Sequence, residues 1–228
     1  MPGLPGVVPT ADFGEAAAAD VSILAVSDPA VSSVAGQLAA HVRAGRVVLH
    51  VAGALGPGAL EPLGSMGCET GGMHPLLALG PNTEAGAFQG TLFSISGSPS
   101  ARAVAGELAH ALGGEPIQLE PDVRLRYHAA AALVAQGAVA LVHVARQEIA
   151  HGPGGGPGLD PTSARQGLAS LLRSVAANLA SGEPRDVLTG PIVRQDSDTV
   201  RAHREVAGAD SAAFQDLILR VLLPLLRG

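Results

Sequence analysis

The chain has 228 residues, a net charge of −6 at pH 7 and 47% hydrophobic residues, enough for a sizeable core in one or two domains. Aromatic residues make up only 2%, which argues against the stacking platforms of nucleic-acid-binding proteins. All 14 basic residues are Arg, and the absence of Lys excludes Schiff-base and P-loop lysine chemistry. The single Cys68 excludes a disulfide framework, and the eight His residues lack the spacing of metal ligands, so no metal site is expected.

No segment has the pattern of a secretion signal or of a membrane span. The first 15 residues have neither a basic start nor an apolar stretch. The longest mostly apolar stretch, residues 129–145, is interrupted by Gln136 and His143 and is shorter than the ~20 residues that cross a bilayer. We therefore expect a soluble, cytoplasmic protein that binds neither a membrane nor nucleic acid.

The first half of the chain alternates strand and helix patterns. Apolar, β-branched runs predict strands at 21–27, 46–53, 70–73, 91–97 and 115–120. Helical spacing of apolar residues predicts helices at 30–44, 57–64 and 99–112. The runs at 21–27 and 46–53 are continuous, which is typical of strands buried on both faces of a parallel sheet. This alternation predicts an α/β fold with a mostly parallel sheet.

After Pro121 the patterns are all helical. Helices are predicted at 122–150, 160–181, 196–207 and 210–227, with Asp160-Pro161 as an N-cap and first-turn proline. We therefore expect a Rossmann-like nucleotide-binding domain at 1–120 and a helical C-terminal domain at 121–228. The long Ala-rich helix and the Leu-rich tail at 217–228 carry more apolar surface than one small domain buries, which predicts a homodimer through the helical half.

A resemblance to a known family rests on six segments: ILAVSDPAV (23–31), VVLHVAGALG (47–56), MHPL (73–76), GTLFSISG (90–97), RYHAAAALVAQ (126–136) and LTGPIVRQD (188–196). In this order and spacing they resemble a family with a Rossmann-like domain followed by the domain of unknown function 2520. Its layout is similar to that of pyrroline-5-carboxylate reductase, ketopantoate reductase and the β-hydroxyacid dehydrogenases. The resemblance implies an oxidoreductase that uses NADP or NAD to reduce or oxidise a small carbonyl, hydroxy or imine acid.

One part of the family pattern is missing from this sequence. Such proteins begin with a strand, a GxGxxG turn, a helix and a second strand, whereas this chain enters the pattern just before residues 21–27. The glycines at 71–72 and 152–158 do not stand between a buried strand and a helix, where backbone N–H groups cradle a pyrophosphate. Set against the family pattern, this sequence implies a truncated Rossmann-like domain with impaired cofactor binding. Two explanations of the missing part are open: the start of the chain is placed too late, or the protein is a shortened paralogue. The alternative to the enzyme is a non-catalytic remnant that acts as a dimeric scaffold or small-molecule binding protein.

Candidate binding residues follow the ends of the predicted strands, because ligands of open α/β sheets lie beyond the carboxyl ends of the strands. The resemblance implies cofactor contacts from Val26, Ser27, Asp28, Pro29, Ala52 and Gly53. It implies substrate contacts from His50, Ala54, His74, Tyr127, Thr189 and Arg194. Two alternatives remain open: Asp28 as a helix N-cap, and Arg194 paired with Asp196 or Asp198.

The predicted acid/base is His128, which lies next to Tyr127 at the start of the long helix. Pockets form at domain junctions, and an imidazole suits the delivery of a proton to a carbonyl or imine. The resemblance places this Tyr-His pair at the cleft, where the hydroxyacid dehydrogenases carry a Lys. Gln136, eight residues later, lies near the same helical face and is the second catalytic candidate. His50, His74 and His128 could each equally be structural histidines.

Overall fold

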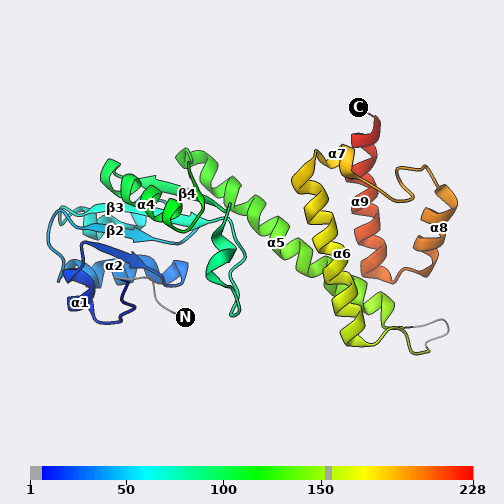
Figure 1. The fold of residues 1–228 in the computed structure, drawn as a ribbon, viewed down its shortest axis with the longest axis horizontal. Coiled ribbons are helices and arrows are strands. Elements are labelled where there is room, and N and C mark those ends of the chain that lie inside the picture. The colour runs from blue at the N-terminus through cyan, green and yellow to red at the C-terminus, as the bar shows by residue number, and fades with distance from the viewer. Residues whose placement is uncertain (1–6, 152–155, 228) are drawn as a thin grey trace. The chain divides into compact units, whose positions relative to one another are not determined.

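The computed structural model describes residues 7–151 and 156–227 (Figure 1). The chain divides into two compact units, the first ending at Leu133 and the second beginning at Val134. The boundary falls inside one long helix, α5 (Pro121–Ile149), whose first turns belong to the first unit. Each unit is therefore described by itself.

A five-stranded sheet forms the centre of the first unit. Its strands in spatial order are β1 (Val21–Leu24), β2 (Val47–His50), β3 (Glu69–Pro75), β4 (Leu92–Gly97) and β5 (Glu115–Gln118). The first three strands are parallel, β4 is antiparallel to β3, and β5 is parallel to β4. In register, Leu24 lies beside His50, and His50 beside Gly72. The predicted α/β fold with a mostly parallel, Rossmann-like sheet is confirmed.

Helices cover both faces of the sheet (Figure 1). Val48 of β2 packs in one buried cluster with α2 (Val31–Ala39). Its neighbour Leu49 packs in a second cluster with Ala105 of α4 (Pro99–Ala111). Because successive strand residues face opposite sides of a sheet, α2 and α4 lie on opposite faces. The first unit thus has the helix–sheet–helix layers of an α/β domain.

The outer strand β1 differs from its prediction. It ends at Leu24 and lies at the edge of the sheet, and the side chain of Ile23 is 46% exposed. The expectation that residues 21–27 are buried on both faces is therefore wrong, because an apolar run does not reveal whether helices cover both faces of the strand. A hydrogen bond of 2.7 Å, donated by Ser22 Oγ to the carbonyl of Ala16, fastens this strand to α1 (Phe13–Ala18).

Two further elements end earlier than predicted. The helix α2 stops at Ala39 instead of residue 44, and β2 stops at His50 instead of residue 53. Residues 51–56 therefore form a loop beyond the carboxyl end of β2, which matters for the site described below. The remaining short elements of this unit are η1 (Asp28–Ala30), η2 (Pro57–Leu60), α3 (Glu61–Gly64) and η3 (Ala85–Phe88).

The second unit is helical, as predicted. After α5 it contains α6 (Pro161–Ser181), α7 (Pro184–Val187), α8 (Ser197–Val206) and α9 (Ala209–Arg227). Asp160 caps α6 as expected, its carboxylate accepting from the backbone N–H groups of Thr162 and Ser163. Between α6 and α8, the single turn of α7 interrupts the connecting segment. An ion pair between Arg204 and Asp216 links α8 to α9.

The surface of α5 is unusually apolar. Leu133, Val134 and Val139 are each more than 70% exposed. Among the described helices, α5 alone has the length and hydropathy of a membrane-spanning segment, and none of that apolar window is buried. The expectation that no segment has the length and composition of a membrane span is wrong for α5, a 29-residue helix that extends beyond residues 129–145 at both ends. Length and composition also suit a helix that another protein chain covers.

Candidate functional site

Three histidines from three elements of the first unit lie around the loop that follows β2. His50 ends β2 and is fully buried, His74 lies in β3, and His128 lies two turns into α5. The His74 and His128 rings meet edge to face, with centroids 5.6 Å apart. The Nε2 atom of His50 lies 3.2 Å from the carbonyl oxygen of Gly56, a contact that fixes the far end of the loop. The structure thus brings together three residues that the sequence analysis singled out separately.

Gly53 lies under the two converging rings. A Cβ atom at this position would lie 2.5 Å from His128 Nδ1 and 2.7 Å from His74 Nε2, closer than real Cβ contacts. Glycine is required here for space, so that the imidazoles can approach the backbone of the loop. His74, His128 and the predicted cofactor residue Gly53 therefore form one tightly packed group.

Several buried polar atoms around this group have no hydrogen-bond partner. They are the Nδ1 atoms of His50, His74 and His128, the Tyr127 hydroxyl, and the Oγ atoms of Ser94 and Ser96. Ser94 lies opposite His74 across β3 and β4, and Ser96 opposite Gly72. Buried polar groups in proteins are nearly always paired. A concentration of unpaired ones marks a place where water or a polar ligand binds.

The surroundings of His50 and His74 favour uncharged imidazoles. Burial lowers the pKa of His50, and the positive charge of Arg124 lowers it further, while the contact with the Gly56 carbonyl opposes these effects. Burial also lowers the pKa of His74, with the neighbouring His128 as the next cause. Burial raises the pKa of the Tyr127 phenol. At neutral pH His50 and His74 can therefore donate or accept a hydrogen bond without carrying charge.

A cavity of about 390 Å³ opens beside this group in the first unit. Its lining includes Ala54, Gly56, Ser96, Arg102, Glu120 and Arg124. Arg124 is only 5% exposed and lies one turn before His128 on α5. Arg124 and the two serines, Ser94 and Ser96, are not among the residues predicted from the sequence. Spacing could have found them, because residues i and i+4 share a helical face and alternate residues share a strand face.

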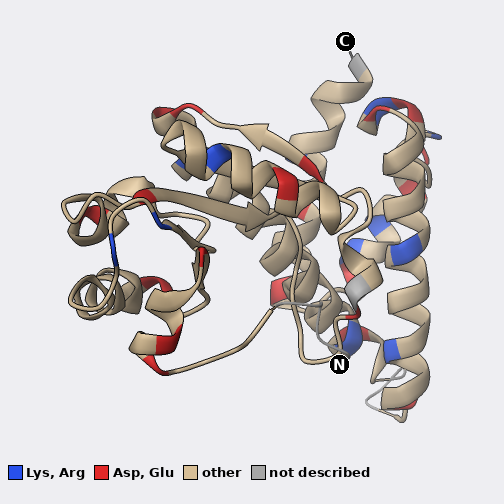
Figure 2. Ribbon diagram, turned by 60° about the vertical axis from the view of Figure 1, so that its left-hand side comes forward, with Lys and Arg blue, Asp and Glu red and all other residues tan. Residues whose placement is uncertain are grey.

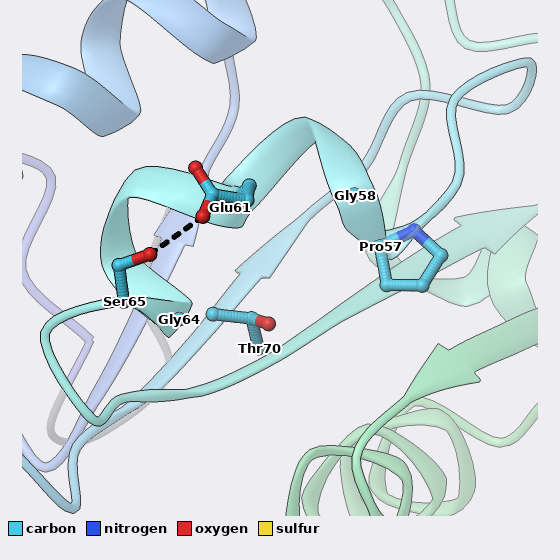
Figure 3. A pocket seen from close by; sticks show the side chains of 6 residues that line it. All are labelled: Pro57, Gly58, Glu61, Gly64, Ser65 and Thr70. Atoms are coloured by element: carbon cyan, nitrogen blue, oxygen red, sulfur yellow. Dashed lines mark hydrogen bonds between the residues drawn. The ribbon is translucent and has the colours of Figure 1, made fainter.

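A second hollow of about 420 Å³ lies over η2 and α3 (Figure 3). Glu61 accepts a hydrogen bond of 2.5 Å from the Ser65 hydroxyl, and the remaining lining residues include Thr70 and three small residues, Pro57, Gly58 and Gly64. No unpaired buried polar atom of the described residues lies among these lining residues. The hollow near Arg124 is therefore the better candidate for a ligand site.

The predicted cofactor residues lie at the carboxyl ends of β1 and β2. Val26, Ser27, Asp28 and Pro29 are exposed, and Ala52–Ala54 belong to the loop after β2. Because Leu24 lies beside His50 in register, the two segments leave neighbouring strands. The N-cap alternative for Asp28 is wrong: this residue lies inside η1, and its side chain caps neither η1 nor α2.

The other predicted residues lie in the second unit. Gln136, Thr189 and Arg194 are all exposed there. Hydrogen bonds from Thr199 lower the pKa of Asp196, and the positive charge of Arg194 adds to this effect. Asp198 pairs with Arg201. Acidic and basic segments are interspersed along the ribbon (Figure 2), in keeping with a chain of modest negative charge.

Several solved structures share this fold. Protein TM1727 of Thermotoga maritima superposes with a TM-score of 0.69 at 19% identity, over 90% of this chain and 78% of that chain. The candidate NADP oxidoreductase BF3122 of Bacteroides fragilis gives 0.69 at 20% identity, over 96% and 80%. A pyrroline-5-carboxylate reductase of Coxiella burnetii gives 0.53 at 16% identity, over 96% and 78%. At these identities the likeness establishes the fold.

The sequence itself matches two domain families. The Rossmann-like domain family matches residues 4–75, and the domain of unknown function DUF2520 matches residues 91–220, more than half of the chain. A comparison with curated proteins finds no match. The two matches follow each other along the chain, as the sheet unit and the helical unit do. The chain belongs to the DUF2520 family, and its DUF2520 domain follows a Rossmann-like domain.

Proposed function

We propose that this protein is a nicotinamide-dependent oxidoreductase acting on a small carbonyl, hydroxy or imine acid, with His128 as the proton donor. The observation that carries the proposal is the meeting of His128 and His74 over Gly53, among buried polar atoms that have no partner. The group lies next to the loop after a parallel strand, where ligands of Rossmann-like sheets bind. The similarity in fold to a candidate NADP oxidoreductase and to a pyrroline-5-carboxylate reductase supports the same interpretation.

The residues present fit one end of a nicotinamide cofactor. Residues 26–29 and 52–54 leave neighbouring parallel strands and would hold the ribose and nicotinamide of NADP or NAD, which supplies a hydride when bound. In the described residues, no glycine-rich turn joins a buried strand to a helix N-terminus, the usual pyrophosphate site. We therefore propose that the chain by itself contacts the cofactor mainly through its nicotinamide side and binds it weakly.

The proposed chemistry of the protein itself is proton transfer and positioning. His128 gives a proton to the oxygen or nitrogen of the substrate as its carbon is reduced, and takes the proton back in the reverse direction. His74 packs edge to face on His128 and holds its ring orientation. Gly53 leaves room for both rings. Gln136, Thr189 and Arg194 remain predictions as further catalytic or substrate-binding residues.

The test measures oxidation of NADPH and NADH, each at millimolar concentration because the chain is proposed to bind the cofactor weakly, with a panel of small 2-oxo, 3-oxo and cyclic imino acids. Wild-type protein should reduce at least one of them, and His128→Asn should lower the turnover while leaving the fold intact by circular dichroism. His143→Asn is the matched control, because His143 is an exposed histidine of the same helix. Full activity in His128→Asn would show that His128 is structural only.

We further propose that the protein works as a homodimer in the cytoplasm, without a membrane or nucleic-acid partner. The helical unit exposes Val134, Val139, Leu171 and Val221 on α5, α6 and α9, each more than half exposed. Apolar surface of this extent on a soluble chain marks an interface. A second copy of the chain is the occupant we propose, because most soluble oligomers are homodimers.

A further inference from the structure

The strongest unexplained feature of the first unit is Arg124, an arginine that is largely buried and faces a cavity. The residue is 5% exposed and lines the cavity described above. No carboxylate of the described residues forms an ion pair with it. A buried charge without a partner is costly, and natural proteins keep such a group mainly where something else pairs with it.

A second arginine lines the same cavity. Arg102 donates through Nη1 to the carbonyl of Gly97 at 2.6 Å, which holds its guanidinium beside the end of β4. Ser96, whose buried hydroxyl has no partner, lines the cavity as well. The only carboxylate in the lining is that of Glu120, an exposed residue. The cavity therefore offers two cations and a free hydroxyl, the donors that bind an oxyanion.

From this arrangement we propose that the Arg124 cavity binds the carboxylate of the substrate. The proposal rests on the proposed function, because it assigns this cavity to the same reaction. Arg124 and His128 are four residues apart on α5, so they share a face one turn, about 5–6 Å, apart. A carboxylate on Arg124 would thus leave His128 within reach of a group one or two bonds away. The substrate class is therefore a 2-oxo or 3-oxo acid, or the corresponding hydroxy or imino acid.

An oxyanion at this place could also be a phosphate of the cofactor. Position favours the carboxylate, because Arg124 lies one helical turn from His128, the proposed proton donor. A phosphate at the adenosine end of a cofactor lies far from the nicotinamide. The experiment includes an adenosine phosphate to decide between the two sources.

The test is direct binding, which needs no turnover. Tyr127 is the only Tyr in a chain without Trp and lies three residues from Arg124, so its fluorescence reports on the cavity. Wild-type protein should bind 2-oxobutanoate, and should bind neither its uncharged analogue butan-2-one nor 2′-AMP at the same concentrations. Arg124→Gln should weaken 2-oxobutanoate binding tenfold or more, since charge-assisted hydrogen bonds are lost. Arg124→Lys should lie in between, because it keeps the charge and loses the fork of donors.

The matched control is Arg126→Gln, an exposed arginine on the same turn of α5, which should bind as wild type does. Circular dichroism verifies that each variant is folded. Failure of wild type to bind 2-oxobutanoate, equal binding by folded Arg124→Gln, or Arg124-dependent binding of 2′-AMP alone would overturn the inference. Binding without any NADPH-dependent reduction would count against the proposed function instead. If the protein reduces a substrate and Arg124→Gln leaves KM unchanged, the proposed function stands but Arg124 does not bind the substrate.

Discussion

Substitution of Gly53 by Ala tests the packing at the centre of the site. The added Cβ would lie 2.5 Å from His128 Nδ1 and 2.7 Å from His74 Nε2, whereas ordinary contacts begin at 3.4 Å. The two rings must therefore retreat by about 0.9 and 0.7 Å, or the loop must move by a similar distance. Overpacking of this kind costs ~1–3 kcal/mol. The lower chain entropy of Ala in the unfolded state returns ~0.4–1 kcal/mol.

The expected result is a loss of about 1–2 kcal/mol in the free energy of unfolding, measured by urea titration with circular dichroism. The imidazole NMR signals of His74 and His128 should shift, because both rings move. Turnover should fall by about 100-fold, the effect of misplacing a reacting group by roughly 1 Å. Gly58→Ala is the matched control, since nothing lies within 4 Å of a Cβ at that exposed position.

The control should be neutral or slightly stabilised. A Gly53→Ala protein with wild-type stability and unmoved histidine signals would refute the close approach of the two rings to the loop. If Gly53→Ala loses stability but keeps full turnover, the close packing is supported and it does not contribute to catalysis.

Four further predictions follow from the site and the fold. His128→Ala should lower the turnover of a reducible acid by ~100-fold, as removal of a general acid does; an unchanged rate would remove that role. The folded-state pKa values of His50 and His74 lie below the ordinary 6.5, so the free energy of unfolding should be greatest above that pH and decrease as the pH falls below it. This slope, measured by urea unfolding, should flatten in a His50→Asn, His74→Asn double variant. Calorimetry should find millimolar or weaker NADPH binding by the 228-residue chain, since the lost pyrophosphate contacts are worth ~1.5–3 kcal/mol each; micromolar binding would reveal another phosphate site. Sedimentation at tens of micromolar protein (roughly, on the affinity scale) should show a dimer, and a pure monomer would contradict the proposed interface.

Much of the fold could be predicted because its signals are local. Apolar runs of period two and 3.6 mark the five strands and the long helices, and Asp160 followed by Pro161 marks the start of α6. The same local segments carried the resemblance to the DUF2520 family. They also singled out His50, His74 and His128, since each stands at the end of a strand or at the start of a long helix.

What only the tertiary structure decided depends on contacts between distant residues. The sequence does not state that Ile23 of β1 faces solvent, because the covering of a strand face depends on helices from other parts of the chain. It does not state that His128 lies on Gly53, 75 residues earlier, because packing of α5 on the first unit creates that approach. Nor does it state that Arg124 is buried: an arginine in a polar helical turn ordinarily faces water. Here residues of β4 and of the loop after β2 lie around the same cavity as Arg124 and leave the residue 5% exposed. The burial of this arginine beside a cavity makes it a candidate binding group.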